Sequence, residues 1–143
     1  MKILVPIDGS KTSKRAIEEA KLIGEKFKAK LIAFTVIPET TIFEQFPTNF
    51  PYALEVSKAN TEHAELVLSD IEKLLKDYPY ETETLYKTGD PASEIVELAQ
   101  AKEVNLIIMG NRGLGAFSRT LLGSVSSKVL NHSPVSVLVI KDA

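Results

Sequence analysis

Residues 104–115 of the chain read VNLIIMGNRGLG, an apolar run followed by a loop that contains three glycines. The run from Val104 to Met109 has the length of one strand, and its apolar residues are nearly continuous rather than alternating with polar ones. Continuous runs are typical of strands covered on both faces, as in a parallel sheet flanked by helices. The segment therefore predicts a central strand that ends at a loop from Gly110 to Gly115.

The rest of the chain repeats this pattern of apolar runs and segments with helical periodicity. Strands are predicted at residues 3–7, 31–37, 82–88, 104–109 and 135–140, the third of them as a half-exposed edge. Helices are predicted at residues 12–28, from about Val56 to Leu75, from Asp90–Pro91 onward and around residues 119–130. This order favours one α/β domain over residues 1–143, with a doubly wound, five-stranded parallel sheet.

The composition and charge of the chain exclude several classes of function. The chain has 143 residues, 44% hydrophobic and 25% charged, with a net charge of −2 and no cysteine. Without cysteine there is no disulfide, thiolate metal site or thiol nucleophile. The small net charge provides no general field that would attract nucleic acid or an anionic membrane. The apolar run at the N-terminus is too short for a signal peptide, and no run is long enough to cross a bilayer, so we expect a cytoplasmic protein.

Two loops that follow predicted strands have an unusual composition: Asp8-Gly9-Ser10 and residues 110–115. In an open parallel sheet, ligands bind at the carboxyl ends of the strands. We expect Gly110, Gly113 and Gly115 to turn with positive φ and to bring successive N–H groups toward an anion, aided by the next helix N-terminus. Three glycines could equally form only a tight turn.

Nine residues separate Gly113 from Gly123-Ser124, and the resulting spacing G-x-x-G-(nine residues)-G-S resembles the ATP-binding motif of the universal stress protein family. The resemblance extends over the whole chain. Segment 3–10 (ILVPIDGS) looks like the family's opening strand and loop, and segment 133–139 (SPVSVLV) like its closing strand. It implies strand order 3-2-1-4-5 with helices on both faces, and a homodimer formed through the last strand, residues 135–140.

The resemblance also implies an ATP pocket, in which Mg or Mn accompanies the nucleotide. Val36 would read adenine through its backbone, Pro6 and Asp8 would border the adenosine, and Asp8 would lie near any metal. The nucleotide-binding residues implied in this way are Pro6, Asp8, Val36, Gly110, Asn111, Arg112, Gly113, Leu114, Gly115, Ala116, Gly123, Ser124, Val125 and Ser126.

The sequence does not offer a clearly placed catalytic base. His63 lies on or beside the apolar stripe of its helix and is interpreted as packing or surface, and His132 as a residue near a helix C-terminus. Three functions stay open: an ATP-responsive regulatory or stress-response protein, a slow ATPase or nucleotidyl- or phosphoryl-transfer enzyme, and a dimeric scaffold with a structural nucleotide. A phosphoacceptor receiver is a poor match, since the third strand ends in Tyr86-Lys87-Thr88 without an aspartate.

The segment from Pro38 to Tyr52 has no counterpart in the family pattern. It carries Phe43, Phe46 and Phe50 without a regular period, and long loops of this kind are usually functional. Exposed aromatic residues often mark contact sites, so one interpretation of this segment is a surface for a regulatory protein partner. The alternative is that its phenylalanines fold back and close the core.

Overall fold

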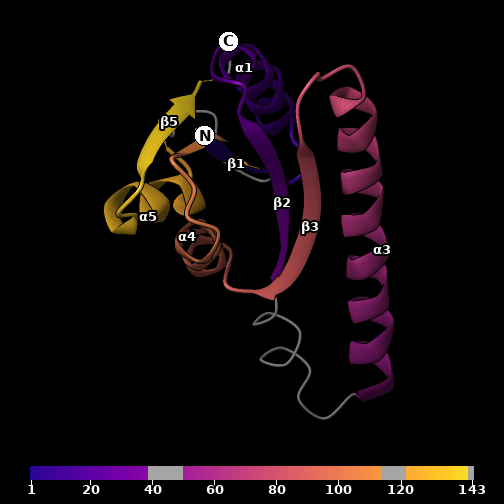
Figure 1. Ribbon diagram of the computed structural model, residues 1–143. Helices are drawn as coiled ribbons and strands as arrows, with labels where there is room; N and C mark the ends of the chain where they lie inside the picture. Colours follow the sequence, from indigo (N-terminus) through magenta and orange to yellow (C-terminus); the bar gives the residue numbers. More distant parts are fainter. Residues whose placement is uncertain (39–49, 114–121, 142–143) are drawn as a thin grey trace.

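Five parallel strands form the sheet of the computed structural model, which describes residues 1–38, 50–113 and 122–141. In space their order is β3-β2-β1-β4-β5 (Figure 1). Their bounds are β1 Lys2–Pro6, β2 Lys30–Pro38, β3 Thr82–Gly89, β4 Leu106–Gly110 and β5 Ser136–Ile140. The predicted sheet and its order are confirmed, and the strand bounds differ from the predicted ones by at most two residues.

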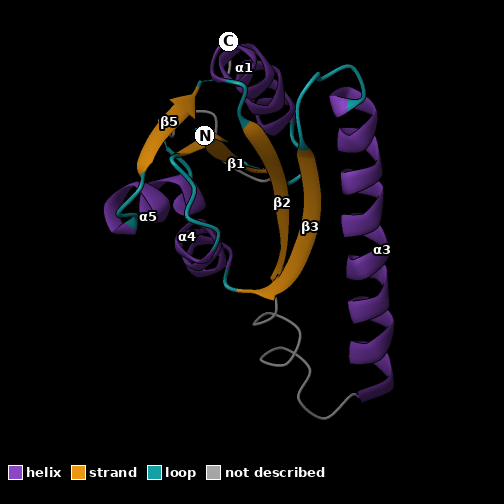
Figure 2. Cartoon of the chain, viewed as in Figure 1, coloured by secondary structure: helices purple, strands orange, loops and turns teal. Residues whose placement is uncertain are grey.

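Helices cover both faces of the sheet, as predicted (Figure 2). Their bounds are α1 Lys11–Phe27, α3 Phe50–Leu75, α4 Pro91–Ala101 and α5 Ser124–His132. One buried cluster joins α1 and α3 to the odd-numbered residues of β1, such as Val5. The other joins α4 and α5 to residues of the opposite face, such as Leu4 and Phe34. Two layers of helices thus sandwich the sheet and leave its carboxyl edge for a site.

The order of the strands makes β3 and β5 the two edges of the sheet. β3 is an edge strand with mostly exposed or half-exposed residues, as the mixture of Glu and Thr predicts. β5 is the other edge, and its Leu138 side chain is 37% exposed. The strand order reverses between β1 and β4, and the helices that follow these two strands, α1 and α5, pack on opposite faces of the sheet. Ligands of such sheets bind at this point.

Local signals explain where α1 and α4 begin. The Ser10 hydroxyl caps α1 by accepting the Ser13 N–H at 3.2 Å. The Asp90 carboxylate caps α4 by accepting the Ser93 N–H at 3.1 Å, and Pro91 occupies the first turn. Both arrangements satisfy an amide that has no partner within the helix. The predicted start of α4 is therefore confirmed together with its cap.

Two predicted boundaries are wrong. The helix expected around residues 119–130 begins only at Ser124, because Leu122 and Gly123 are not helical and Gly123 is the N-cap residue. The loop expected from Pro38 to Tyr52 is shorter, since β2 includes Pro38 and α3 starts at Phe50. The partner surface proposed for that loop falls mainly on residues 39–49, which lie outside the described residues.

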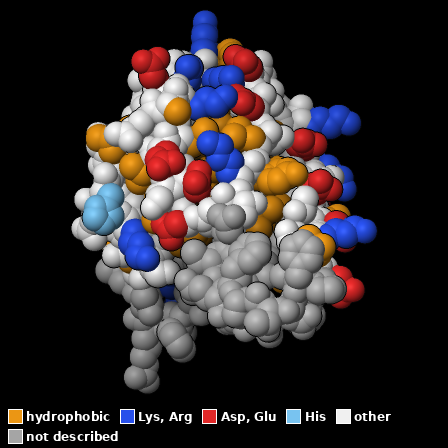
Figure 3. Space-filling model, turned by 90° about the horizontal axis from the view of Figure 1, so that it is seen from below, with side chains coloured by type: hydrophobic (Ala, Val, Ile, Leu, Met, Phe, Trp, Pro, Cys, Tyr) orange, Lys and Arg blue, Asp and Glu red, His pale blue; other side chains and the backbone are white. Residues whose placement is uncertain are grey.

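The surface of the described part carries charges of both signs. Seen from below, Lys and Arg side chains are interspersed with Asp and Glu (Figure 3). This mixture agrees with the net charge of −2. Within the described ranges, no helix has both the length and the apolar character that a membrane span requires.

Candidate functional site

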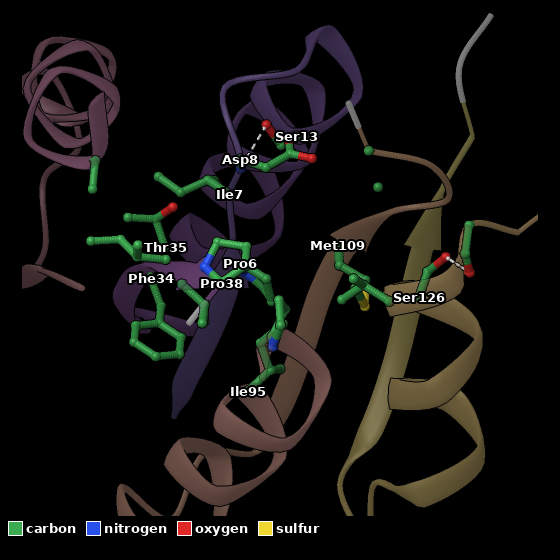
Figure 4. A pocket seen from close by; sticks show the side chains of 18 of the residues that line it. Pro6, Ile7, Asp8, Ser13, Phe34, Thr35, Pro38, Ile95, Met109 and Ser126 are labelled. Atoms are coloured by element: carbon green, nitrogen blue, oxygen red, sulfur yellow. Dashed lines mark hydrogen bonds between the residues drawn. The ribbon is translucent and has the colours of Figure 1, made fainter. Parts of the chain in front are cut away.

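A cavity of about 540 Å³ lies at the carboxyl ends of the strands and reaches the walls of the flanking helices. Figure 4 shows Thr35 and Ile7 on its α3 side, Ile95 of α4 below, and Ser126 of α5 at the opposite end. Its size and its mixture of apolar and polar residues suit a small organic ligand. The site residues predicted from the sequence that line it are Pro6, Asp8, Val36, Gly110, Arg112, Gly113, Gly123, Ser124, Val125 and Ser126.

Asn111, the remaining predicted residue that the structure describes, does not line this cavity. Asn111 is 3% exposed and braces the end of the sheet, since its N–H donates to the Ile140 carbonyl at 2.9 Å. Leu114, Gly115 and Ala116 lie outside the described residues, as does Arg119. The structure thus brings together, from four elements and their loops, residues that lie more than a hundred positions apart in the sequence.

The turn between β1 and α1 is held by its own polar groups. The Ser10 N–H donates to Asp8 Oδ1 at 2.9 Å, and Gly9 adopts a φ of +87°. The Ser13 hydroxyl donates to the Ser10 carbonyl at 2.9 Å and lies 3.5 Å from the Asp8 N–H (Figure 4). A left-handed φ at this position favours glycine. These contacts fix the Asp8 carboxylate at the rim of the cavity.

The carbonyl of Asn111 ties the β4 loop to the start of α5. It accepts the Gly123 N–H at 2.6 Å and the Ser126 hydroxyl at 2.6 Å. A hydroxyl has a single proton to donate, so the Ser126 proton is engaged within the protein. The resemblance implies Ser126 as a nucleotide-binding residue, which stays a prediction, and in the structure its hydroxyl joins the start of α5 to the β4 loop.

Positive φ is not the reason for the glycines in this loop. The described glycines with positive φ are Gly9 and Gly89, so the expectation for Gly110 and Gly113 is wrong. Their small size explains them better. A Cβ at Gly110 would lie 2.7 Å from Thr12 Cγ2, and one at Gly113 would clash with Asp8 Oδ2. Both glycines therefore allow the β4 loop to approach the β1 turn closely.

Gly123 differs from these two glycines. A Cβ there would meet Arg112 Cα at 3.4 Å, which is an ordinary van der Waals contact. Its backbone is extended, with φ −73° and ψ 172°. Among the described residues, neither the backbone conformation nor the contacts of an added Cβ require glycine at this position.

The α5 end of the cavity favours an anion. Among the described residues, no side chain caps the N-terminus of α5, and the first turn of the helix contains no acidic residue. The partial positive charge of a helix N-terminus is strongest there, and Arg112 lines the same end. Ser124, the first residue of α5, is exposed and lines the cavity.

Asp8 is the one acidic residue among the described residues that line the cavity. In the described ranges there is no group of three or more His, Asp or Glu side chains that could hold a metal ion by themselves. Mg²⁺ in nucleotide sites commonly takes one or two carboxylates and completes its shell with phosphates and water. Asp8 at the cavity rim fits that pattern as a single protein ligand for a cation carried by a polyphosphate.

Several residues that line the cavity were not predicted from the sequence. Thr35, Asn60 and His63 line the α3 side, and Phe34, Ile95 and Met109 line the α4 side. His63 is exposed, as the surface interpretation predicts, but its place beside the cavity was not foreseen. One available signal was Thr35, a polar residue inside an otherwise apolar strand.

Comparisons with known proteins agree with the fold. The sequence model of the universal stress protein family matches residues 1–141. The universal stress protein MJ0531 of Methanocaldococcus jannaschii is 34% identical over 140 residues, covering 98% of this chain and 81% of the relative. The solved structure of MJ0577 from the same organism superposes with a TM-score of 0.89 at 32% identity, covering 99% of this chain and 96% of the other. A universal stress protein solved in complex with cAMP gives a TM-score of 0.70 at 29% identity, with coverages of 99% and 96%.

Proposed function

The chain belongs to the universal stress protein family, and from this premise we propose that it binds ATP and acts as a nucleotide-dependent regulatory protein of the stress response. The observation that carries the proposal is the polarity of one cavity. Its α5 end has an uncapped helix N-terminus and Arg112, whereas its β2 end is lined by apolar residues such as Val36 and Phe34. A nucleotide has the matching polarity, with phosphates at one end and a base at the other.

The motif residues take separate roles in this proposal. The N–H groups at the start of α5 and the Ser124 hydroxyl bind phosphate, since both are donors at the positive end of a helix. Val36 reads the base through its backbone, and Met109 and Ile95 provide apolar contacts for the ring. Asp8 holds a Mg²⁺ or Mn²⁺ that the phosphates bring with them. The cAMP bound to a relative supports an adenine nucleotide as the ligand class.

Binding with little turnover suits these residues best. Hydrolysis needs a group that positions or deprotonates an attacking water close to the terminal phosphate. Apart from Asp8, which is assigned to the metal ion, the phosphate end as described is built from amides, a serine and Arg112, which stabilise charge rather than accept a proton. We therefore propose that ATP is held and sensed in the cytoplasm, and that its occupancy alters contacts with a partner.

We also propose that the chain forms a homodimer through the strand predicted at residues 135–140. Support comes from β5, a sheet edge whose Leu138 is 37% exposed, because an open apolar edge tends to pair with another strand. Analytical ultracentrifugation at micromolar concentration, with and without ATP, is expected to give twice the chain mass. The mass of a single chain under both conditions would refute the dimer.

Two measurements test the proposed ligand. Mass spectrometry of the supernatant after denaturation is expected to identify an adenine nucleotide released by the purified protein. Calorimetry on protein stripped of nucleotide is expected to give one ATP site per chain, with weaker binding after removal of divalent cations. If no nucleotide is released and ATP at millimolar concentration does not bind, the proposal is wrong.

A further inference from the structure

We propose that Thr35, Asn60 and His63 form a base-reading wall, which sets the preference of the cavity for adenine over guanine. The proposal rests on the proposed function, because it assigns these residues to the base of the bound nucleotide. All three line the cavity from its α3 side. None of them belongs to the glycine motif, and none lies near the α5 end of the cavity.

The Thr35 hydroxyl is the first observation behind this wall. The residue is 6% exposed, yet no hydrogen bond joins its hydroxyl to any described residue. Every fully buried side-chain polar atom in the described ranges has a partner. The Thr35 oxygen is therefore reached through the cavity that it lines (Figure 4). Buried hydroxyls are normally satisfied, so this group is available to a ligand.

The position of α3 brings two further polar groups to the same side. A Cβ added at Gly9 would lie 3.2 Å from Val67 Cγ2, so α3 packs over the β1 turn at Val67. His63 and Asn60 precede Val67 by four and seven residues, which keeps them on the same helix face, one and two turns further along. Both side chains thus flank the cavity beyond the β1 turn.

The base is the part of the nucleotide that reaches this wall. The phosphate end lies between β4 and α5, and β2 is two strands away from β4, about 10 Å at the usual strand spacing. Thr35 directly precedes Val36, whose side chain packs on the opposite face of the sheet. A base whose edge meets the Val36 backbone therefore has the Thr35 hydroxyl beside it.

The chemistry of the wall fits a base rather than a phosphate. A hydroxyl and a carboxamide each combine donor and acceptor capacity without a charge, and an imidazole adds ring nitrogens that can form hydrogen bonds with a base. Purine bases differ in their hydrogen-bond donors and acceptors, since adenine presents an amino donor where guanine presents a carbonyl acceptor. A site that leaves one such group unpaired rejects the wrong base more strongly than an apolar slot does.

Calorimetry with ATP and GTP on wild type, Thr35→Val, Asn60→Ala and His63→Ala tests the wall. Thr35→Val keeps the shape and removes the hydroxyl, and His63 is exposed, so these variants are expected to fold. We expect the ratio of ATP to GTP affinity to change about three- to tenfold in at least one variant, as one neutral hydrogen bond implies. Glu65→Ala, an exposed change on the same helix that does not line the cavity, is expected to leave both affinities unchanged.

A change at the phosphate end provides the second control. Ser124→Ala is expected to weaken ATP and GTP by the same factor and to leave their ratio unaltered. If the ratio changes less than threefold in all three wall variants while the wild type binds ATP, the base-reading wall is wrong and the proposed function stands. If the wild type binds neither nucleotide, both proposals are wrong.

Discussion

The N-termini of α4 and α5 both lie at the carboxyl edge of the sheet, yet they are built in opposite ways. α4 follows Asp90, whose carboxylate accepts the N–H and the hydroxyl of Ser93 at 3.1 and 2.8 Å, and Glu94 adds a second acid in its first turn. α5 follows Gly123, without a side-chain cap and without an acid in its first turn. One helix neutralises its own positive end, and the other leaves that end to the cavity.

The two helix N-termini therefore differ in what stabilises them: a side chain of the protein at α4 and, in the proposed function, a bound anion at α5. Replacing a side-chain cap with alanine costs about 1 kcal/mol of stability, whereas glycine, the N-cap residue of α5, costs only a few tenths of a kcal/mol. An uncapped N-terminus is favourable only when another anion meets it, which is the situation in a phosphate site. The contrast therefore supports α5 rather than α4 as the helix whose N-terminus meets the phosphates, while α4 contributes Ile95 to the wall of the cavity.

The largest expected effect is that of Gly113→Val. A Cβ at this position would clash with Asp8 Oδ2, while the φ of Gly113 lies outside the left-handed region, so the backbone itself is not strained. The Asp8 carboxylate is expected to be displaced and the cavity rim filled, which removes measurable ATP binding and leaves the sheet folded. Calorimetry together with circular dichroism measures both effects. A folded variant that binds ATP like the wild type would show that the loop is only a turn.

The next largest effect tests the α5 end by making it resemble α4. Gly123→Asp introduces a capping carboxylate where the φ and the space allow one. At about 4 Å, one negative charge repels another by roughly 4 kcal/mol near a protein surface, so ATP affinity is expected to fall at least tenfold. Stability is expected to rise by a few tenths of a kcal/mol, because aspartate caps better than glycine.

Neutral variants at the same position separate charge from bulk. Gly123→Asn caps without a charge, and Gly123→Ala adds only the methyl group. We expect the loss of ATP affinity to be largest for aspartate, and urea unfolding to show all three variants folded. Equal losses for aspartate and alanine would mean that close approach of the phosphate, not the helix charge, requires the glycine.

The contrast between the two helices was only half visible in the sequence. Asp90-Pro91 is a strong local start signal, and the structure confirms it. At α5 the apolar pair Leu121-Leu122 extended the helical pattern past Gly123, so the predicted start was too early. Strand positions were predictable because continuous apolar runs identify strands covered on both faces. The base-reading wall was not predictable, since Thr35 and His63 line the same cavity only because α3 packs over the β1 turn.

Ser124→Ala is expected to produce a smaller loss. The hydroxyl lines the cavity at the first residue of α5, while the backbone amides of that turn are unchanged by the substitution. Losing one hydrogen bond to phosphate is expected to cost about 0.5–1.5 kcal/mol, and up to about 3 kcal/mol if the phosphate charge strengthens the bond. Titration calorimetry with ATP measures this cost. Ser127→Ala, one turn further along α5 and outside the cavity lining, is the matched control and should bind like the wild type.

Asp90→Ala is expected to leave ATP affinity within a factor of two of the wild type, because the α4 end does not meet the phosphates. The substitution is expected to lower stability instead, because losing the cap costs about 1 kcal/mol and lowers Tm by roughly 3–5 °C.

The hydrogen bond from the Ser93 hydroxyl holds the pKa of Asp90 below its ordinary value of 3.8. A lowered folded-state pKa means that this stabilisation is present above about pH 4 and is lost as the pH falls through the folded-state value. Urea unfolding is therefore expected to show a larger difference in stability between wild type and variant at pH 7 than at pH 3. A tenfold loss of ATP affinity in this variant would contradict the division of roles, since it would make the capped end of α4 part of the nucleotide site.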